Sequence, residues 1–153
     1  MESCPLSSQK QKFARILVRD GNRYLVVHNI KLGRNRWEFP GGKCDPTDTG
    51  SLHTAQRELE EEVGLRVLGA QVFVCSADMY VGPDTCAEEV TTEWTGDFWL
   101  VDVKNTVGKA YIPESEKLKC DKIKWVTTEE LANLPQIPLV GVDIARKADR
   151  LLA

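Results

Sequence analysis

Apolar residues recur at helical spacing in the segment around residue 57. The intervals between them are three or four positions, and the residues are Leu52, Ala55, Leu59 and Val63. This spacing predicts a short amphipathic helix that buries one stripe and exposes its other faces. Gly64 follows the last apolar position directly, and a glycine there is typical of a helix that ends in the left-handed region.

Short apolar or alternating runs before and after this helix predict strands. We expect strands at 12–19, 23–28, around Trp37, and at 66–75, 94–103 and 122–127, with a tight turn at 20–22. Residues 76–92 are expected to form a long loop or hairpin, and helices are expected at 127–134 and 140–152. The pattern predicts one mixed α and β domain, at 12–153, after a polar and flexible segment at 1–11.

Three glutamates share one face of the predicted helix. Glu58, Glu61 and Glu62 stand at positions i, i+3 and i+4, where like charges repel one another. By itself such an acidic run is usually a solvated helix face. A hard divalent cation would remove the repulsion, and oxygen ligands without His or Cys suit Mg²⁺, with Mn²⁺ as the alternative. Because Mg²⁺ in proteins often shares its coordination shell with substrate phosphates, this face of the helix is a candidate for one side of a phosphate-binding site.

Two motifs around the helix carry a family resemblance. The first is WEFPGGK at 37–43, and the second is RELEEEVGL at 57–65. Together they resemble the Nudix box, here 42–65, with the entry segment of MutT-type members. The resemblance implies an α+β fold, namely a Nudix-type α/β/α sandwich with a mixed β-sheet, over most of the chain.

The box departs from the family pattern at its isolated glutamate. Counted from Gly42, that position is Asp48, and one residue too many separates it from Arg57. We interpret the difference as a single insertion just before the helix, where an extra loop residue costs little, with Asp48 as a shorter replacement. Thr49 or Ser51 is expected to cap the helix.

The resemblance also implies roles for residues of the box. A divalent metal would be held by Glu58, Glu61, Glu62 and the backbone carbonyl of Gly41. Glu61 and Glu62 would also serve in catalysis, and Arg57 would orient the glutamates through charge-assisted bonds.

A second and looser likeness to MutT-type nucleotide hydrolases follows the box. It lies in ESEK at 114–117 and WVTTEEL at 125–131. It makes Glu116, and after it Glu114, a candidate further metal ligand or catalytic base. The alternative for both residues is an ordinary charged loop.

Cations near the glycines are candidates to bind phosphate. Lys43 follows the two glycines, and Arg34 and Arg36 belong to a basic loop. Cations that face a polyphosphate would raise its local concentration, although each could equally face solvent. On the aromatic strand, Phe98 is the candidate to stack on a nucleobase, with Trp99 and Trp94 as further candidates, although strand aromatics usually belong to the core.

The implied reaction is metal-dependent hydrolysis of a nucleoside diphosphate linked to another group. The WEFPGGK entry and the small size favour a (d)NTP or a modified (d)NTP, cleaved to the monophosphate and pyrophosphate. ADP-ribose or a nucleoside diphosphate sugar is the alternative substrate class. A Nudix module that binds nucleotides without turnover is a further alternative, which the presence of all three glutamates disfavours.

The composition of the chain restricts the classes of molecule that are expected to bind it. The net charge of -3 and the isoelectric point near 5.5 argue against a nucleic-acid polymer, which normally meets a basic face, and leave a small nucleotide as the expected partner. No apolar run approaches the length of a membrane span. Five cysteines without metal-ligand spacing predict a reducing, cytoplasmic location. The sequence leaves homodimer formation open.

Overall fold

Strand β1 (Gln11–Asp20) lies at the centre of the structure and pairs on both of its sides. The computed structural model describes residues 11–81, 92–135 and 140–152. On one side β1 runs parallel to β7 (Thr92–Asp102), and on the other it pairs antiparallel with β4 (Gly41–Lys43). The central strand is therefore also the one that positions the glycines of the box.

The main sheet has seven strands of mixed direction within the described residues. The hairpin partner of β1 is β2 (Arg23–Asn29), which leaves β1 after two paired positions and then pairs antiparallel with β3 (Arg36–Glu38) and β9 (Cys120–Val126). Strand β6 (Val72–Val81) pairs antiparallel with β7. A small second sheet joins β5 (Arg66–Val67) to β8 (Thr106–Val107).

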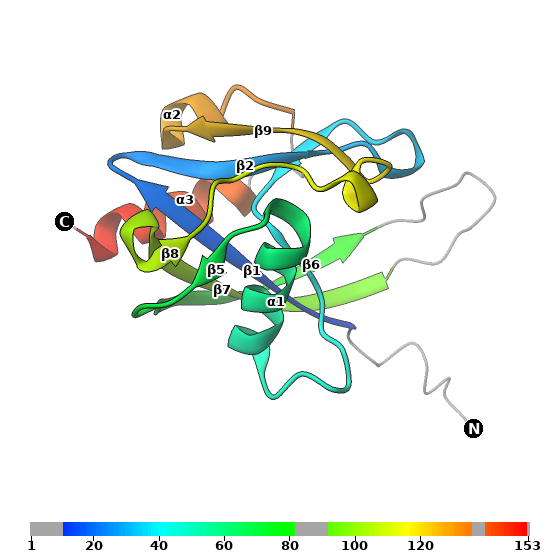
Figure 1. Cartoon of the computed structure of the whole chain (residues 1–153), viewed down its shortest axis with the longest axis horizontal. Coiled ribbons are helices and arrows are strands. Elements are labelled where there is room, and N and C mark those ends of the chain that lie inside the picture. The colour runs from blue at the N-terminus through cyan, green and yellow to red at the C-terminus, as the bar shows by residue number, and fades with distance from the viewer. Residues whose placement is uncertain (1–10, 82–91, 136–139, 153) are drawn as a thin grey trace.

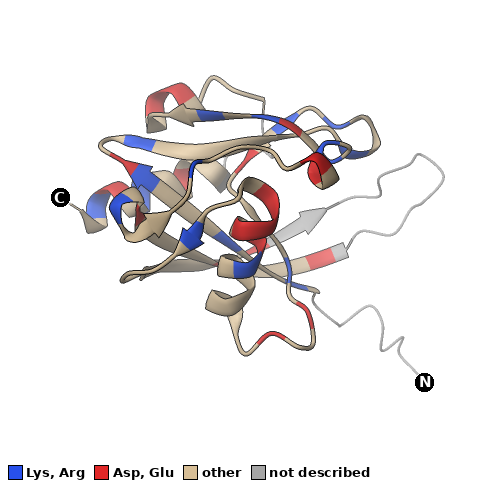
Figure 2. Ribbon diagram, in the orientation of Figure 1, with Lys and Arg blue, Asp and Glu red and all other residues tan. Residues whose placement is uncertain are grey.

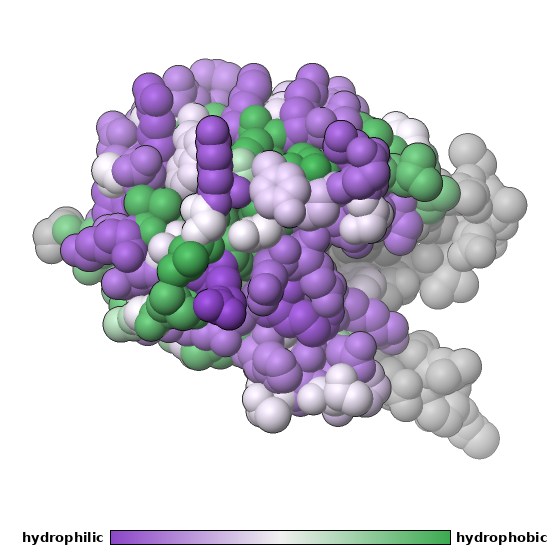
Figure 3. All heavy atoms as spheres, in the orientation of Figure 1, coloured by the Kyte–Doolittle hydropathy of each residue, from purple (hydrophilic) through white to green (hydrophobic). Residues whose placement is uncertain are grey.

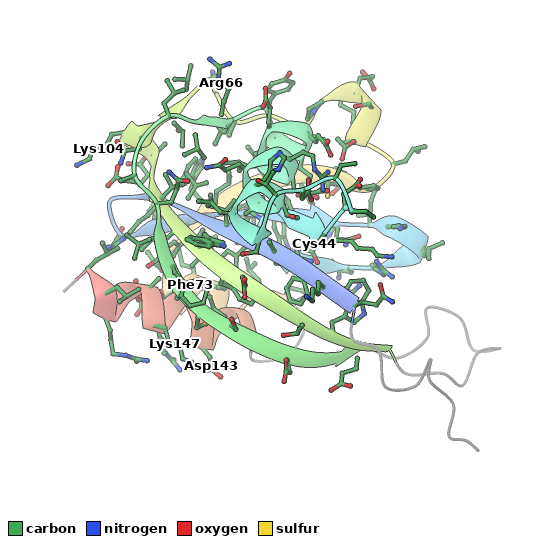
Figure 4. The ribbon with its side chains drawn as sticks, turned by 90° about the horizontal axis from the view of Figure 1, so that it is seen from below. Cys44, Arg66, Phe73, Lys104, Asp143 and Lys147 are labelled. Carbon is green, nitrogen blue, oxygen red and sulfur yellow. The ribbon has the colours of Figure 1, made fainter. Side chains whose placement is uncertain are left out.

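Helices cover both faces of the main sheet. Helix α1 (Ser51–Val63) packs on β1, β4 and β7, whereas α3 (Val140–Leu151) packs on β6 and on α2 (Thr128–Leu131) at the opposite face, as Figures 1 and 4 show. Short 3₁₀ turns, η2 (Lys31–Gly33), η3 (Val103–Asn105) and η4 (Glu114–Glu116), lie in the connections. The expected α+β fold, a mixed sheet between helices, is confirmed.

Alternation along β1 divides the apolar residues between two cores. Phe13 and Leu17 face the α3 side, and Ala14, Ile16 and Val18 face α1. The side chains of successive strand residues point to opposite faces of the sheet, so a strand with helices on both sides is apolar nearly throughout. This explains why 12–19 reads as a continuous apolar strand.

Several expected boundaries were wrong. The strand expected at 66–75 is split into β5 and β6, and β6 continues to Val81, where its antiparallel pairing with β7 agrees with the hairpin that was one of the two expectations for 76–92. The helix expected to reach residue 134 is a single turn, α2, capped by Thr127 and Glu130 in a reciprocal capping box. Residues 1–10 of the expected flexible segment, and 82–91 of the expected loop, lie outside the described residues.

The start of α1 also differs from the expectation. Its N-cap is Gly50, and neither Thr49 nor Ser51 caps it with a side chain. The two side chains have other partners, because Thr49 lies against His53 and Ser51 accepts a hydrogen bond from the Trp99 indole at 3.1 Å.

A half-buried carboxylate joins the helices of the α3 face to the sheet. Asp149 accepts hydrogen bonds from the Tyr24 hydroxyl at 2.6 Å and from the Thr128 hydroxyl at 2.8 Å. The three residues belong to α3, β2 and α2. Burial, together with the Asp149 carboxylate, raises the pKa of Tyr24, so the phenol stays a donor at all ordinary pH values.

We therefore predict that Asp149→Ala lowers the free energy of unfolding by about 2–3 kcal/mol, since two buried hydroxyls lose a charged acceptor. Asp143→Ala, on the exposed side of the same helix (Figure 4), should cost at most about 0.5 kcal/mol. Urea denaturation followed by circular dichroism measures both. Equal losses in the two variants would contradict the role of Asp149.

Candidate active site

The C-terminal half of α1 lies close against the glycines of β4. A Cβ atom added to Gly42 would lie 2.6 Å from the carboxyl carbon of Glu58, so a larger residue there would displace the Glu58 carboxylate from its present position. The helix ends immediately afterwards, because Gly64 adopts a left-handed conformation at φ 72° and donates its N–H to Glu60 at 3.0 Å. The acidic positions of the helix are thereby fixed next to β4 (Figure 2).

The Arg57 guanidinium joins the loop before α1 to the acidic face of the helix. Nε and Nη2 each donate to one carboxylate oxygen of Asp48 at 3.0 Å, a bidentate arrangement. Nη1 donates to Glu58 at 2.9 Å and to Glu61 at 3.2 Å. The distances agree with the expectation that Arg57 orients the glutamates.

Asp48 is the anchor of that loop. Its side chain is 3% exposed and also accepts from the Thr54 hydroxyl at 2.6 Å and from the backbone N–H of Asp45 at 2.9 Å. Hydrogen bonds from Arg57 and Thr54 hold the pKa of this carboxyl well below its usual range. Asp48 has a shorter side chain than the glutamate of the family pattern, but both of its carboxylate oxygens accept hydrogen bonds, including two from the Arg57 guanidinium.

Glu62 is a carboxylate on the buried face of the helix. Its residue is 5% exposed, and its side chain accepts the Gly41 N–H at 3.2 Å. Burial raises the pKa of Glu62 to about 8, although the nearby Arg15 opposes the shift. A carboxylate held there needs a positive partner when it is charged.

Glu58 and Glu61 differ in their surroundings. Burial raises the pKa of Glu58, while Arg57 opposes that shift. The Glu61 side chain is 53% exposed, and the described residues that line the adjoining cavity include Glu58 and Glu62 but not Glu61. The structure therefore brings two of the three predicted ligands, with Gly41, to one cavity wall.

The cavity next to these carboxylates has a volume of about 690 Å³. The predicted phosphate-binding residues Lys43, Arg34 and Arg36 all line it. Four more lining residues bear on function and were not expected from the sequence: Phe13, Arg15, Glu38 and Lys119. Figure 3 shows that hydrophilic atoms cover this part of the surface, whereas hydrophobic atoms gather over β5 and β8.

An aromatic pair forms another wall of the cavity. The rings of Phe13 and Trp94 meet edge to face with centroids 6.2 Å apart, and Trp94 is partly exposed. The prediction that Phe98 stacks on a base was wrong, because Phe98 is 2% exposed and packs against Phe13 in the core. Alternation alone could have indicated that 94 and 98 share a face, but not which of them reaches the cavity.

Glu116 and Glu114 lie on η4, before β9. Glu116 pairs with Lys119 at 3.2 Å and is not among the residues that line the cavity, and Glu114 is 90% exposed and pairs with Lys117. Glu116 thus touches the cavity only through Lys119, which lines it. The role of Glu116 and Glu114 as ligand or base remains a prediction.

The donor set suits a hard divalent cation only in part. Glu58, Glu62 and the Gly41 carbonyl offer oxygen ligands in one place, as Mg²⁺ requires. Within the described residues, however, no three His, Cys, Asp or Glu side chains form a ready metal cluster. A cation bound here would complete its shell with water and with ligand oxygens, which is how Mg²⁺ is usually held.

The fold and the site define the class of protein. The family model of the NUDIX domain matches residues 10–145, and the chain belongs to this family. Its fold matches that of the MutT NUDIX hydrolase from Burkholderia pseudomallei, with a TM-score of 0.69 and 21% identity, over 90% of this chain and 96% of that one.

Sequence relatives have several different substrates in their names. The mitochondrial coenzyme A diphosphatase of Mus musculus is 58% identical over 46 residues, which are 29% of this chain and 22% of that protein. The 8-oxo-dGTP diphosphatase of Buchnera aphidicola is 33% identical over 66 residues, 42% of this chain and 50% of that protein. The RNA pyrophosphohydrolase of Francisella tularensis is 26% identical over 126 residues, 79% of each chain.

The matches to the coenzyme A diphosphatases cover only a part of those proteins. The chain covers less than a third of the length of the coenzyme A diphosphatases that it resembles. Within the described residues, no helix is both long enough and apolar enough to cross a membrane. The cytoplasmic location is therefore still a prediction from the sequence, and the formation of a homodimer is untested.

We predict that Asp48→Asn lowers the free energy of unfolding by about 2–3 kcal/mol, because the bidentate pair with Arg57 loses its charge. Glu60→Gln, an exposed substitution on the same helix, is the matched control and should be nearly neutral. Chemical denaturation at neutral pH measures the difference. A loss no larger than that of the control would show that the loop is held by other contacts.

The raised pKa of Glu62 predicts a pH dependence of stability in the presence of EDTA. The folded chain keeps a proton on Glu62 that the unfolded chain releases near its ordinary pKa of 4.5. The stabilisation from this proton is complete below pH 4.5 and is lost as the pH rises to about 8.

Glu62→Gln, neutral at every pH, should therefore flatten the fall in unfolding free energy between pH 5 and 8. Urea midpoints at three pH values, for wild type and variant, provide the measurement. Parallel curves for the two proteins would contradict a raised pKa at this residue.

Proposed function

We propose that the chain hydrolyses the diphosphate bond of a nucleoside diphosphate linked to another group. The preferred substrate is a (d)NTP or a modified (d)NTP, and the products are the monophosphate and pyrophosphate. The observation that carries the proposal is that one cavity joins the carboxylates Glu58 and Glu62, the cations Lys43 and Arg15, and the ring of Trp94. The carboxylates would bind a metal ion, the cations would bind the phosphates, and the aromatic ring would stack on the base.

The reaction explains why the site combines both signs of charge. A polyphosphate repels an attacking water and accumulates charge on the leaving phosphate, so catalysis depends mainly on positioning and on positive charge. A divalent cation, Mg²⁺ or Mn²⁺, would supply charge neutralisation and a more acidic bound water. Glu58, Glu62 and the Gly41 carbonyl would hold it, and Glu61 or Glu62 would accept the proton of the water.

The other predicted residues complete this proposal. Arg57 would hold Glu58 and Glu61 in place through its hydrogen bonds to both, and would thus act as a positioning residue. Lys43, Arg34 and Arg36 would bind phosphate oxygens, and Trp94 replaces Phe98 as the residue expected to stack on the base. The cavity volume lies in the range of ordinary small-ligand sites.

The names of the relatives favour the same bond and leave the nucleoside open. Coenzyme A, 8-oxo-dGTP and a triphosphate at an RNA end share a phosphoanhydride attached to a nucleoside. A coenzyme A substrate is the second candidate, because the local identity to coenzyme A diphosphatases is high. ADP-ribose or a nucleoside diphosphate sugar and a non-catalytic nucleotide module are the further alternatives.

The test is hydrolysis of a substrate panel with Mg²⁺ or Mn²⁺, followed by release of pyrophosphate or phosphate from the triphosphates and by chromatography of the phosphomonoester products from the other compounds. The panel contains ordinary, oxidised and methylated (d)NTPs, coenzyme A, ADP-ribose, UDP-glucose and a short RNA with a 5′-triphosphate. We predict turnover of a free triphosphate, and a loss of about a hundredfold or more in Glu58→Gln, because a charged ligand for the cation is removed.

Glu60→Gln is the control for the panel, since Glu60 is exposed on the same helix and does not line the cavity. It should keep the wild-type rate. Turnover of coenzyme A alone would select the second candidate. If no compound is hydrolysed although a nucleotide raises the melting temperature, the chain is a binding module and the proposal fails.

A further inference from the structure

Lys119 occupies a fixed place at the start of β9. Its backbone N–H donates to the Glu116 carbonyl at 2.9 Å, and its own carbonyl accepts the Ile30 N–H at 2.8 Å. The next residue, Cys120, is 3% exposed and pairs with Asn29 at the end of β2. The backbone at Lys119 is therefore held between the η4 turn and the end of β2.

The side chain of Lys119 lines the same cavity as Glu58 and Glu62. Its Nζ lies 3.2 Å from Glu116 Oε1, and the Glu116 side chain is 17% exposed. Burial alone would lower the pKa of Lys119, but Glu116, Glu62 and Glu58 raise it overall. The ammonium is thus a charged group within the field of the two cavity carboxylates.

A neighbouring ion pair shows that this placement is particular to Lys119. Glu114 and Lys117 have the same i, i+3 spacing on the same turn, at 3.6 Å, but the Glu114 side chain is 90% exposed whereas that of Glu116 is 17% exposed. The two lysines are similar, at 54% for Lys117 and 46% for Lys119. Neither Glu114 nor Lys117 lines the cavity. Two pairs of the same composition therefore differ in whether the lysine reaches the site.

Two other cations of the cavity wall already contact protein acceptors. Arg57 is bound to Asp48, Glu58 and Glu61, and Arg15 donates to the Phe39 carbonyl at 2.6 Å. An ammonium has three donors, and one contact with Glu116 leaves Lys119 with hydrogens to offer to a ligand in the cavity.

We propose that Lys119 binds a phosphate oxygen of the substrate beside Glu58 and Glu62, and that Glu116 is a positioning residue that holds Lys119 in place. This inference rests on the proposed function, because it assumes a polyphosphate in the cavity. It assigns Glu116 to the lysine and not to the cation or the attacking water. The lysine would offset the charge that two carboxylates and a polyphosphate bring together.

The first test compares Lys119→Gln with Lys117→Gln. We expect Lys119→Gln to weaken the binding of inorganic pyrophosphate, measured by calorimetry with Mg²⁺, and to lower kcat/KM for the hydrolysed nucleotide, each by about tenfold or more. Lys117→Gln should stay within about twofold in both. Lys119→Arg, which keeps the charge, should recover part of the loss.

The second test separates positioning from catalysis by Glu116. If Glu116 acts through Lys119, the double variant Glu116→Gln with Lys119→Gln should be no worse than Lys119→Gln alone. The pH profile of kcat should also keep its shape in Glu116→Gln. Multiplied losses, or a missing limb of the profile, would make Glu116 a base or a ligand and overturn its assignment.

The two proposals can fail separately. Absence of turnover over the whole substrate panel would overturn the hydrolase proposal, and pyrophosphate binding would still report on Lys119. Pyrophosphate affinity that is equal in wild type and Lys119→Gln, or absent in both, would overturn the inference about Lys119. Thermal unfolding of each variant verifies the fold, and Lys119→Arg carries the test if Lys119→Gln does not fold.

Discussion

The bidentate pair between Arg57 and Asp48 is the constraint on which the geometry of the site depends. One guanidinium uses two of its nitrogens to hold the loop before α1 and a third to contact Glu58 and Glu61. Carboxylates so close together would repel one another without it. The loop, the helix and the acidic face are therefore one electrostatic unit, and the glycines of β4 complete it by allowing close approach.

Burial divides the three glutamates into different chemical groups. Glu62 lies in the apolar stripe, Glu58 lies at its edge beside Arg57, and Glu61 is largely exposed. The same side chain thus has three environments within one helical turn. Tuning by position in this way is how a protein obtains distinct acid and base behaviour from identical residues.

The sequence was sufficient for the parts of the fold that depend on local pattern. The apolar spacing in α1, the strand character of β1 and the glycine after the helix all predicted the observed elements. Helical spacing also contains the burial of Glu62, which follows Leu59 by three positions and Ala55 by seven, but it does not show how closely α1 approaches β4. In the same way, Trp94 and Phe98 were both candidates on one aromatic strand, and only the packing of that strand in the sheet places Trp94 at the cavity and Phe98 in the core. The Glu116–Lys119 pair depends on a loop, which has no periodicity to read.

The parallel pairing of β1 with β7 has a consequence for how the molecule forms. Gln11 pairs with Trp94, more than half of the 153-residue chain away. The long stretch of chain between them must close into a loop before the stabilising contacts between β1 and β7 can form. Phe13 and Trp94 meet across this pairing. The aromatic wall of the cavity exists only once these two distant strands have met, whereas the contact between α1 and β4 joins segments close in sequence. The two walls of the cavity thus depend on contacts of very different sequence separation.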